Sequence, residues 1–465
     1  MGRFFNRSEN SLVQAYIIVD LGFGDAGKGL VTDFLVRRTG ADLVVRYNGG
    51  AQAGHNVVTP DGRHHTFAQF GSGAFLPGVR TYLSRHVIVH PTALLVEGDT
   101  LATKGVPDVY QRLRISEDAL VITPYHQAAN RIRELLRGDA RHGSCGVGVG
   151  ETVEHALAHP EDCIRAGDLN RPAELRHKLT RIRDHKWTEL RSIMTGSMAS
   201  PSIAREMRIY EDIGVIDAWI GLVARIASLG LVVPDSVLET WLKSSNSVVF
   251  EGAQGVLLDA EAGFHPYTTW SDCTTANALA ILSQMVPGVS VKRVGVMRAY
   301  MVRHGPGPLP TETRELEGFI TEHNQYGDWQ RAVRYGWLDA VLLRYALALT
   351  GGVDSIALTH LDLLPKLKTF KFAIGYEGYR NLDGTAVDRG LLSKNPLQFL
   401  DQRGLDPKYR ARMTDLLMRV TPCLDSCEPD ELKVIGMVGA LIGKPVEMIS
   451  SGPSADQVKV INPTV

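Results

Sequence analysis

A run of apolar residues that passes directly into a glycine-rich loop is the feature that most restricts how this chain can fold. The segment AYIIVDLGFGDAGKGLVTD starts with β-branched residues and then has four glycines within eight positions. A strand, a glycine turn and a helix in succession form a phosphate site, because the N–H groups of the loop and of the helix N-terminus face the anion. We therefore expect a strand over Tyr16–Val19, a helix over Gly29–Arg37 and a phosphate site between them.

The loop departs from the usual P-loop pattern at one position. That pattern ends in lysine followed by serine or threonine, whose hydroxyl binds magnesium, whereas here Lys28 is followed by Gly29. The loop also contains an aspartate, Asp25. Its carboxylate has two candidate roles, as a magnesium ligand in place of the hydroxyl or as a general base, and the local sequence leaves both open.

Further strand-like runs are followed by polar or glycine-rich turns and then by helical segments. This alternation predicts an α/β fold with a large, mainly parallel central sheet, helices on both faces and helical insertions. Ligands should bind at the carboxyl ends of the strands. Residues 172–243 have apolar positions at helical spacing and predict a mostly helical subregion, and without repeats or linkers we expect one domain over 1–465. The further strands are Leu43–Val45, Ser247–Phe250, Arg293–Met297 and Ser355–Leu358.

The charge balance and the cysteines restrict the partners. The 50 Lys and Arg residues nearly balance the 51 Asp and Glu residues, so no overall field favours nucleic acid or an acidic membrane. No apolar stretch has the length of a membrane span, and five widely spaced cysteines are typical of reduced thiols in a cytoplasm. We expect a cytoplasmic protein that binds small charged molecules, with no nucleic acid and no membrane partner.

Other segments place polar side chains after strands. VVRYNGGAQAGHNV contains His55 beside three glycines, and VVFEGAQG is followed by a hydroxyl-rich tail that suits a nucleobase or a phosphate. Each of these also has a purely structural interpretation, as a core histidine or as turns and caps. In THLD, the carboxylate of Asp362 could accept hydrogen bonds from N1–H and the exocyclic amine of guanine, which adenine does not offer.

Together these motifs resemble one family, the adenylosuccinate synthetases, from about Tyr16 to Ile461. The resemblance implies a P-loop-like GTP-binding fold and a GTP-dependent ligase. Such an enzyme phosphorylates the 6-oxo group of inosine monophosphate (IMP) and replaces it with L-aspartate, giving adenylosuccinate, GDP and phosphate, with Mg²⁺ as cofactor. The motifs, in chain order, are GDAGKG, RYNGG followed by AGH, RLRIS, PYH, IRAGDL, FEGAQG, GPGPLPTE, GWLD, THLD and SSGP.

The resemblance also implies a role for each matching residue. Asp25 would be the base toward the purine N1 proton and a magnesium ligand together with the carbonyl of Gly54, and His55 would stabilise the oxygen that receives the phosphoryl group. Arg165 would reach the neighbouring site of a homodimer. The other implied contacts are with GTP for Gly24, Gly27, Lys28, Gly29, Asp362, Ser451, Gly452 and Pro453; with the substrate nucleotide for Gln52, Ser144, Arg165, Gln254, Thr269 and Arg303; and with the amine for Arg331 and Arg334.

The chain departs most from the family in the amine-binding loop, YGDWQRAVRYGWLD. Arg331 and Arg334 remain, but Ala332 and Val333 interrupt the run of arginines, and Trp329 is bulky. Each charged hydrogen bond lost from a carboxylate clamp costs about 1–3 kcal/mol, so the amine is open to question. Other departures are Ala26 for glutamate, Leu30 for lysine, Ala51 and Gln52 for His-Asn, Cys145 for threonine, Val147 for arginine, His304 for a small apolar residue beside the ribose, and His360 for lysine.

Two alternatives to aspartate addition to IMP stay open. One is a divergent synthetase that uses another amine or another purine acceptor such as dGMP. Family members specialised for deoxyguanylate tend to replace the loop aspartate, so the presence of Asp25 argues against that acceptor. The other is a non-catalytic nucleotide-binding homologue, which would have no need of both Asp25 and His55.

Overall fold

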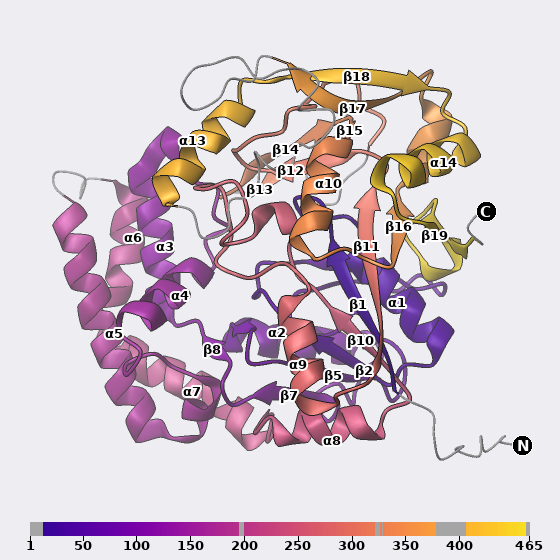
Figure 1. Ribbon diagram of the computed structural model, residues 1–465. Coiled ribbons are helices and arrows are strands. Elements are labelled where there is room, and N and C mark those ends of the chain that lie inside the picture. Colours follow the sequence, from indigo (N-terminus) through magenta and orange to yellow (C-terminus); the bar gives the residue numbers. More distant parts are fainter. Residues whose placement is uncertain (1–12, 195–199, 321–325, 328, 378–405, 462–465) are drawn as a thin grey trace, which may run out of the picture.

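A ten-stranded sheet forms the centre of the molecule (Figure 1). The computed structural model describes residues 13–194, 200–320, 326–327, 329–377 and 406–461. Neighbouring strands in this sheet are parallel except β19 and β20, which confirms the predicted α/β class. In spatial order the strands are β20 (Val458–Val460), β19 (Val446–Ser450), β16 (Ser355–Thr359), β11 (Ser290–Arg298), β1 (Gln14–Asp20), β10 (Ser247–Glu251), β2 (Leu43–Arg46), β5 (Arg80–Leu83), β7 (Leu113–Ser116) and β9 (Val232–Val233).

All the strands predicted from β-branched runs lie in this sheet, as parts of β1, β2, β10, β11 and β16. The predicted helix after the glycine loop is α1 (Lys28–Thr39). Strands β1 and β10 are neighbours, and the chain runs from β1 to β2 on one side but from β10 to β11 on the other. Ligands of open α/β sheets bind at such a reversal of strand order, outside the carboxyl ends of the strands.

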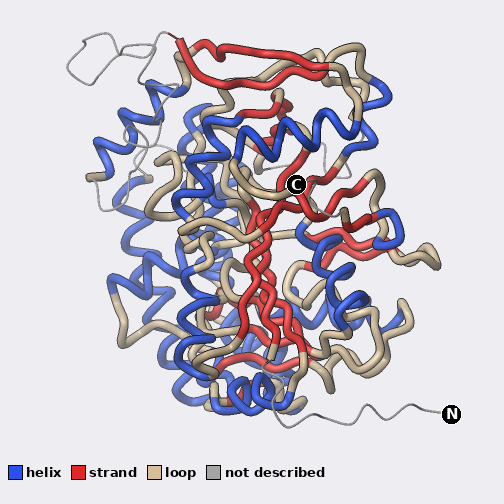
Figure 2. Tube along the Cα trace, turned by 45° about the vertical axis from the view of Figure 1, so that its right-hand side comes forward, coloured by secondary structure: helices blue, strands red, loops and turns tan. Residues whose placement is uncertain are grey.

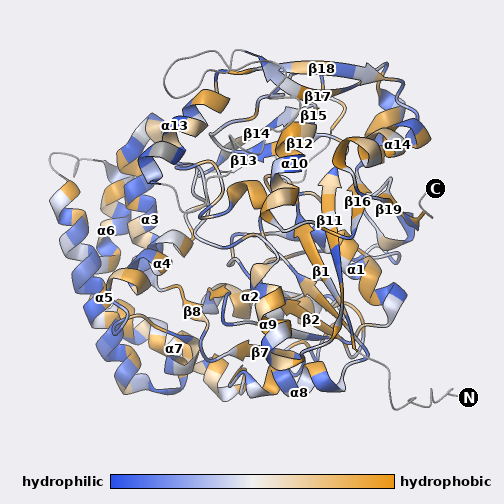
Figure 3. Cartoon of the chain, in the orientation of Figure 1, coloured by the Kyte–Doolittle hydropathy of each residue, from blue (hydrophilic) through white to orange (hydrophobic). Residues whose placement is uncertain are grey.

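Helices cover both faces of the sheet, because side chains alternate along each strand. Ile18 of β1 packs with Val31 and Leu35 of α1 on one face. Its neighbour Ile17 packs on the other face with Leu242 of α8 (Ser236–Ser244) and with α9 (Ala276–Met285). Figure 2 shows the strands as a central band with helices to both sides, and Figure 3 shows that these strands are largely hydrophobic.

A separate helical layer lies to the left of the sheet in Figure 1. It is formed by α3 (Pro124–Arg137), α4 (Val149–Ala158), α5 (Pro172–Ile193), α6 (Pro201–Glu211) and α7 (Gly214–Ser228). The apolar faces of α3, α5, α6 and α7 pack into one core, which includes Ile132, Leu179, Met207 and Val223. The subregion predicted as mostly helical, 172–243, contains α5, α6, α7 and most of α8, with the short strand β9 between α7 and α8.

Smaller elements surround the carboxyl edge of the large sheet. None of the described helices has the length and hydropathy needed to cross a membrane. The remaining strands are β3 (His55–Val58), β4 (His64–Phe67), β6 (Ile88–Val89), β8 (Leu120–Val121), β12 (Met301–His304), β13 (Tyr326–Gly327), β14 (Arg331–Gly336), β15 (Leu338–Asp339), β17 (Phe370–Glu377) and β18 (Thr421–Cys427). The remaining helices are α2 (Pro91–Thr103), α10 (Ala340–Leu349), α13 (Pro407–Leu417) and α14 (Glu431–Ile442).

Candidate active site

Three loops at the carboxyl edge of the sheet contain residues in the left-handed backbone conformation. Asp25, after β1, has a φ of 58°. Within the described ranges, the other non-glycine residues with positive φ are Gln254, after β10, with 56°, and His360, after β16, with 61°. Residues other than glycine rarely adopt this backbone conformation, and those that do are often found at functional sites. The geometry therefore marks these three loops as a candidate site.

The three loops touch one another. A Cβ added to Gly24 would lie 3.8 Å from the carbonyl carbon of Gln254, so the loops after β1 and β10 are in contact. The hydroxyl of Thr359 donates to the carbonyl oxygen of Ala26 at 2.8 Å, which joins the loop after β16 to the first loop. Segments more than 200 residues apart in the sequence thus form one surface.

The carboxylate of Asp20, the last residue of β1, stabilises the glycine loop through hydrogen bonds. It accepts hydrogen bonds from the backbone N–H of Gly22 at 2.8 Å and of Ala26 at 3.0 Å. The ammonium of Lys28 lies 2.7 Å from the same carboxylate, and both side chains are buried. The predicted contact of Lys28 with GTP phosphates stays a prediction, since in this structure its charge is balanced by Asp20. Sequence reasoning missed Asp20, although its place at the end of a strand was visible.

Steric contact explains why the loop has Gly29 where a P-loop has a hydroxyl. A Cβ at Gly29 would lie 2.9 Å from the carbonyl oxygen of Asn56 and 3.0 Å from the Cβ of His55. Strand β3, which carries His55, therefore packs directly on the first turn of α1. The glycine lets β3 bring His55 to the helix N-terminus.

The variant Gly29→Ser, which completes the usual P-loop pattern, is expected to lower the free energy of unfolding by about 1–3 kcal/mol. Turnover should also fall, because β3 and His55 must move. Urea denaturation and steady-state kinetics measure the two effects. Gly221→Ser is the control, because Gly221 is exposed on α7 and an added Cβ there meets nothing within 4 Å. A Gly29→Ser protein as stable and active as the parent would contradict this steric account.

His55 is oriented by a buried carboxylate, Glu251 at the end of β10. The His55 Nδ1 lies 2.6 Å from Glu251 Oε1, and the carboxylate also accepts from the N–H of Ser72 at 3.0 Å and from the Ser72 hydroxyl. Burial and the nearby Arg46 lower the pKa of His55 to about 4, although Glu251 opposes the shift. At neutral pH the ring is therefore neutral, donates from Nδ1, and has its other nitrogen, Nε2, buried without a partner.

Glu251 itself stays ionised. Burial alone would raise its pKa, but Arg46 and His55 hold the pKa at about 2. Glu251 lies in the motif FEGAQG, but no role for this residue was predicted from the sequence. A carboxylate that fixes the tautomer and the orientation of a histidine is a common supporting feature of catalytic sites.

Asp25 is held by the last residues of β11 and β12, Arg298 and His304. His304 Nε2 lies 2.7 Å from Asp25 Oδ2, and the Arg298 Nε donates to the backbone carbonyl of Asp25 at 2.5 Å. Burial alone would raise the pKa of Asp25, but the hydrogen bond and field of His304, with Arg298 and Lys28, hold it well below the ordinary value of a carboxyl. The Asp25 side chain keeps 39% of its surface exposed and stays open to a ligand. His304, recognised in the sequence as a departure, thus pairs with the predicted base.

The variant His304→Val is expected to raise the pKa of Asp25, because the hydrogen bond and field that hold it down are lost. If Asp25 acts as a base, it must be deprotonated, so the acid limb of the kcat/KM profile should move to higher pH in the variant. The pH dependence of kcat/KM for both proteins measures this. Identical acid limbs would rule out an effect of His304 on the base.

Two side-chain amides near the glycine loops have buried polar atoms that form no hydrogen bond with any described residue. Both amide atoms of Gln254 and the Oε1 of Gln52 are buried and make no hydrogen bond. A Cβ at Gly49 would lie 2.7 Å from Gln254 Oε1, so any larger residue at position 49 would collide with the Gln254 amide. Leaving such groups unpaired costs about 1–3 kcal/mol each, and a ligand that satisfies them recovers that free energy. The contacts of Gln52 and Gln254 with the substrate nucleotide stay predictions.

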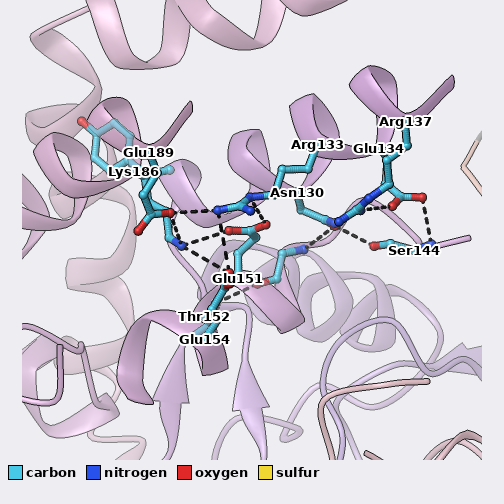
Figure 4. A network of polar contacts seen from close by, with 12 residues as sticks. Asn130, Arg133, Glu134, Arg137, Ser144, Glu151, Thr152, Glu154, Lys186 and Glu189 are labelled. Atoms are coloured by element: carbon cyan, nitrogen blue, oxygen red, sulfur yellow. Dashed lines mark hydrogen bonds and ion pairs between the residues drawn. The ribbon is translucent and has the colours of Figure 1, made fainter. Parts of the chain in front are cut away.

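Other predicted substrate residues make contacts within the protein. The guanidinium of Arg303 donates to the carbonyls of Pro306, Pro308 and Tyr267, and burial lowers its pKa to about 9. The Ser144 hydroxyl donates to Asn130 at 2.9 Å, in the network that Figure 4 shows. The backbone N–H of Thr269 donates to Leu258 at 2.8 Å, and Arg165 is exposed, with its guanidinium on the carbonyl of Asp118 at 2.7 Å. Their contacts with substrate stay predictions.

The arginine expected to bind the amine is engaged elsewhere. Arg334 of β14 donates to the carbonyls of Gly305 and Gly307, at distances of 2.7–3.0 Å, and pairs with Glu312 at 2.7 Å. The side chain of Arg331 lies outside the described residues. Arg334 therefore braces the 305–307 turn in this structure, and its binding of an amine stays a prediction.

The residues predicted to border guanine lie near the surface. Asp362 is exposed and, in the described ranges, makes no hydrogen bond or ion pair. Ser451 and Pro453 are also exposed, and Gly452 is half-buried against Gln457. The loop that contains them reaches β3, where Val58 pairs with Ser454. The predicted magnesium ligands, the Asp25 carboxylate and the Gly54 carbonyl, are oxygen donors of the type that Mg²⁺ prefers.

The fold and the site define a class: a doubly wound α/β enzyme with a glycine-rich loop at the reversal of strand order, where Asp25 and the Glu251-bound His55 lie. The chain belongs to the adenylosuccinate synthetase family, because the adenylosuccinate synthetase family model matches residues 17–459. It is a ligase of the adenylosuccinate synthetase type. The adenylosuccinate synthetase of Azotobacter vinelandii is 32% identical over 451 residues, which cover 96% of this chain and 98% of the relative. That of Pseudomonas fluorescens is 32% identical over 450 residues, with the same coverage.

Two solved structures share the fold. Fully ligated adenylosuccinate synthetase from Plasmodium falciparum has a TM-score of 0.74 at 21% identity, covering 97% of this chain and 100% of that one. Cyanophage S-2L succinoaminodeoxyadenylate synthetase, bound to dGMP and to dATP as an energy donor, has a TM-score of 0.58 at 17% identity, covering 97% and 95%. At these identities the two structures support the fold alone.

Proposed function

We propose that this protein uses GTP and Mg²⁺ to phosphorylate the 6-oxo group of IMP and then replaces the phosphate with L-aspartate, giving adenylosuccinate, GDP and phosphate. The observation that carries the proposal is the pair of polar groups at the phosphate loop. Asp25 is exposed enough to meet a ligand, and His55 is fixed by Glu251 against the first turn of α1. A protein that only bound nucleotide would need neither arrangement.

In the first step Asp25 accepts the N1 proton of the purine, which places negative charge on the 6-oxygen. That oxygen attacks the γ-phosphorus of GTP, and GDP leaves. Bound Mg²⁺ would offset phosphate charge. His55 lies where the glycine loop meets α1, and its Nε2 has no partner among the described residues. The negative charge of the two nucleotides favours protonation of Nε2, after which the ring donates to the transferring group while Glu251 stabilises the imidazolium.

The proposed choice of GTP rests on Asp362. Its carboxylate is exposed after β16 and, among the described residues, unpaired, so it can accept both guanine N–H groups. The exposed guanidinium of Arg165 is compatible with the proposed homodimer, in which it would contact the neighbouring subunit's substrate phosphate. In the second step the amine attacks C6 of the purine and phosphate leaves.

A second candidate is the same chemistry with another amine, or with another purine acceptor such as dGMP. Two observations favour it. The guanidinium of Arg334 donates its hydrogen bonds to Gly305, Gly307 and Glu312, and not to a carboxylate of the amine substrate. His304 also adds an imidazole beside Asp25, where the family usually has a small apolar side chain.

The experiment is a substrate panel read by GDP release and product mass. IMP and dGMP are each combined with aspartate, other amino acids and ammonia, and with GTP, ATP or dATP as phosphoryl donor. We expect adenylosuccinate from GTP, IMP and aspartate, and a much lower rate with ATP. Product only with another amine or with dGMP would establish the second candidate, and no product or GDP release with any combination would contradict both. Equal use of GTP and ATP would remove the role of Asp362.

A further inference from the structure

A cluster of three histidines lies in the helical layer, in a part of the chain that the proposed reaction does not use. His155 is on α4, His159 directly follows that helix, and His185 is on α5. Each offers a ring nitrogen, and these nitrogens lie within 4.8 Å of one another. The ring centroids are 5.0 Å apart for His155 and His159, and 4.0 Å apart for His159 and His185. Two helices thus present three imidazoles to one point.

The polar atoms of this cluster lack partners although they are buried. His155 is 1% exposed, and both of its ring nitrogens are buried without a hydrogen bond. The Nδ1 of His185 is also buried and unpaired. A buried polar group without a partner costs about 1–3 kcal/mol, and each neutral ring has one nitrogen with a free lone pair, so these histidines favour a ligand that accepts lone pairs. A metal cation has that property.

A carboxylate stands beside the histidines. His159 also forms a potential ligand group with Glu161 and Asp162, whose atoms again lie within 4.8 Å of one another. One oxygen of Asp162 pairs with Arg181 at 2.7 Å, while the other, Oδ2, is buried and unpaired. Asp162 therefore places negative charge beside His159, which favours a cation at this end of the cluster.

The positive charge of Lys186 does not prevent cation binding. The ammonium of Lys186 is next to His185 in the chain, and it lies 3.0 Å from Glu151, 3.1 Å from Glu189 and 3.6 Å from Glu154. Figure 4 shows this network, in which Arg133 shares the same three carboxylates. With two cations and three carboxylates, the network offers no net positive charge to oppose a metal ion.

We propose that His155, His159 and His185 bind one divalent transition-metal ion of the zinc type, with a further coordination position open to water. Imidazole nitrogens suit Zn²⁺, whereas Mg²⁺ prefers oxygen, so the site is chemically separate from the proposed magnesium site at Asp25. The ion joins α4 to α5. Because α4 begins at Val149, directly after the loop that contains Ser144, the ion also anchors that loop to the helical layer.

The test uses the whole protein, freed of metals with a chelator and returned to excess Mg²⁺. Titration with ZnCl₂ in a calorimeter should show one equivalent bound, and Co²⁺ should give the visible absorption of a tetrahedral N/O site. Zinc should also raise Tm, since an ion that binds the folded state stabilises it. No zinc uptake by the parent protein, or binding only as weak as that of the variants below, would overturn the proposal.

The variants separate this site from adventitious binding. His185→Asn and His159→Asn change partly exposed ligands, so both proteins should fold, and each should bind zinc at least about tenfold more weakly. His177→Asn, which removes an exposed histidine from the same helix α5, should leave zinc binding unchanged. Equal zinc affinity in His185→Asn and the parent would also overturn the proposal.

Discussion

Replacing Asp25 by asparagine is expected to lower kcat by at least about a hundredfold, because the purine N1 proton then has no acceptor. Asparagine gives a clearer test than alanine, because it tolerates the left-handed φ of 58° and keeps an oxygen that can pair with His304. Asp25→Ala should lose at least as much activity, and it adds backbone strain of about 1–2 kcal/mol. Steady-state GDP release with the preferred substrates measures kcat for each protein.

The control is the folded state of the variants. Circular dichroism and urea denaturation should give Asp25→Asn nearly the stability of the parent, so that the loss of kcat cannot come from unfolding. His304→Val serves as the matched neighbour, because it removes the partner of Asp25 but leaves the carboxylate in place. An Asp25→Asn protein with more than about a tenth of the parent's kcat would sink the proposed base.

The sequence predicted the parts of the site that depend on local order. The run from Tyr16 to Val19 followed by glycines predicts strand, loop and helix, and the structure has β1, the loop and α1 at these places. Turn glycines and β-branched strands are decided by a few neighbouring residues. The parallel sheet follows from the repetition of such units.

The partners of the functional side chains could not be predicted in the same way. His55 and Glu251 are 196 positions apart and meet only because the start of β3 lies beside the end of β10. The pairing of Asp25 with His304 likewise needs the turn after β11 to return to the first loop. A residue-by-residue resemblance carries roles over, but it does not say which side chains the departures bring together.

The departures at His304 and in the amine loop lie on two paired strands. Strands β12 and β14 are antiparallel, with His304 opposite Val333 and Arg303 opposite Arg334. Side chains opposite one another on such strands are close neighbours. A change of amine would therefore alter the residues beside the base as well, which is why the substrate panel varies the amine and the purine together.

The second large loss of activity is expected from His55→Gln, which should lower kcat by about 100–1000-fold, the usual loss on removing one donor to transition-state charge. Glu251→Gln should also lower kcat, because a glutamine cannot compensate an imidazolium. In addition, its amide places a donor opposite the N–H of Ser72, which donates to Glu251 at 3.0 Å. Steady-state kinetics measures both effects, and a His55→Gln protein with parental kcat would contradict the role of His55.

The same substitution tests whether His55 is buried in the neutral state. Its pKa is about 4 in the folded protein, below the ordinary value of 6.5, so the unfolded chain binds the extra proton first as the pH falls. His55 therefore removes stability as the pH drops from 6.5 toward 4, by about 1.4 kcal/mol per pH unit. Urea denaturation across this window should show a shallower slope for His55→Gln than for the parent. His177→Gln, which removes an exposed histidine, should keep the parent's slope. If His55→Gln also keeps it, the ring is already charged in the ligand-free protein, and the uptake of a proton on nucleotide binding is not part of the mechanism.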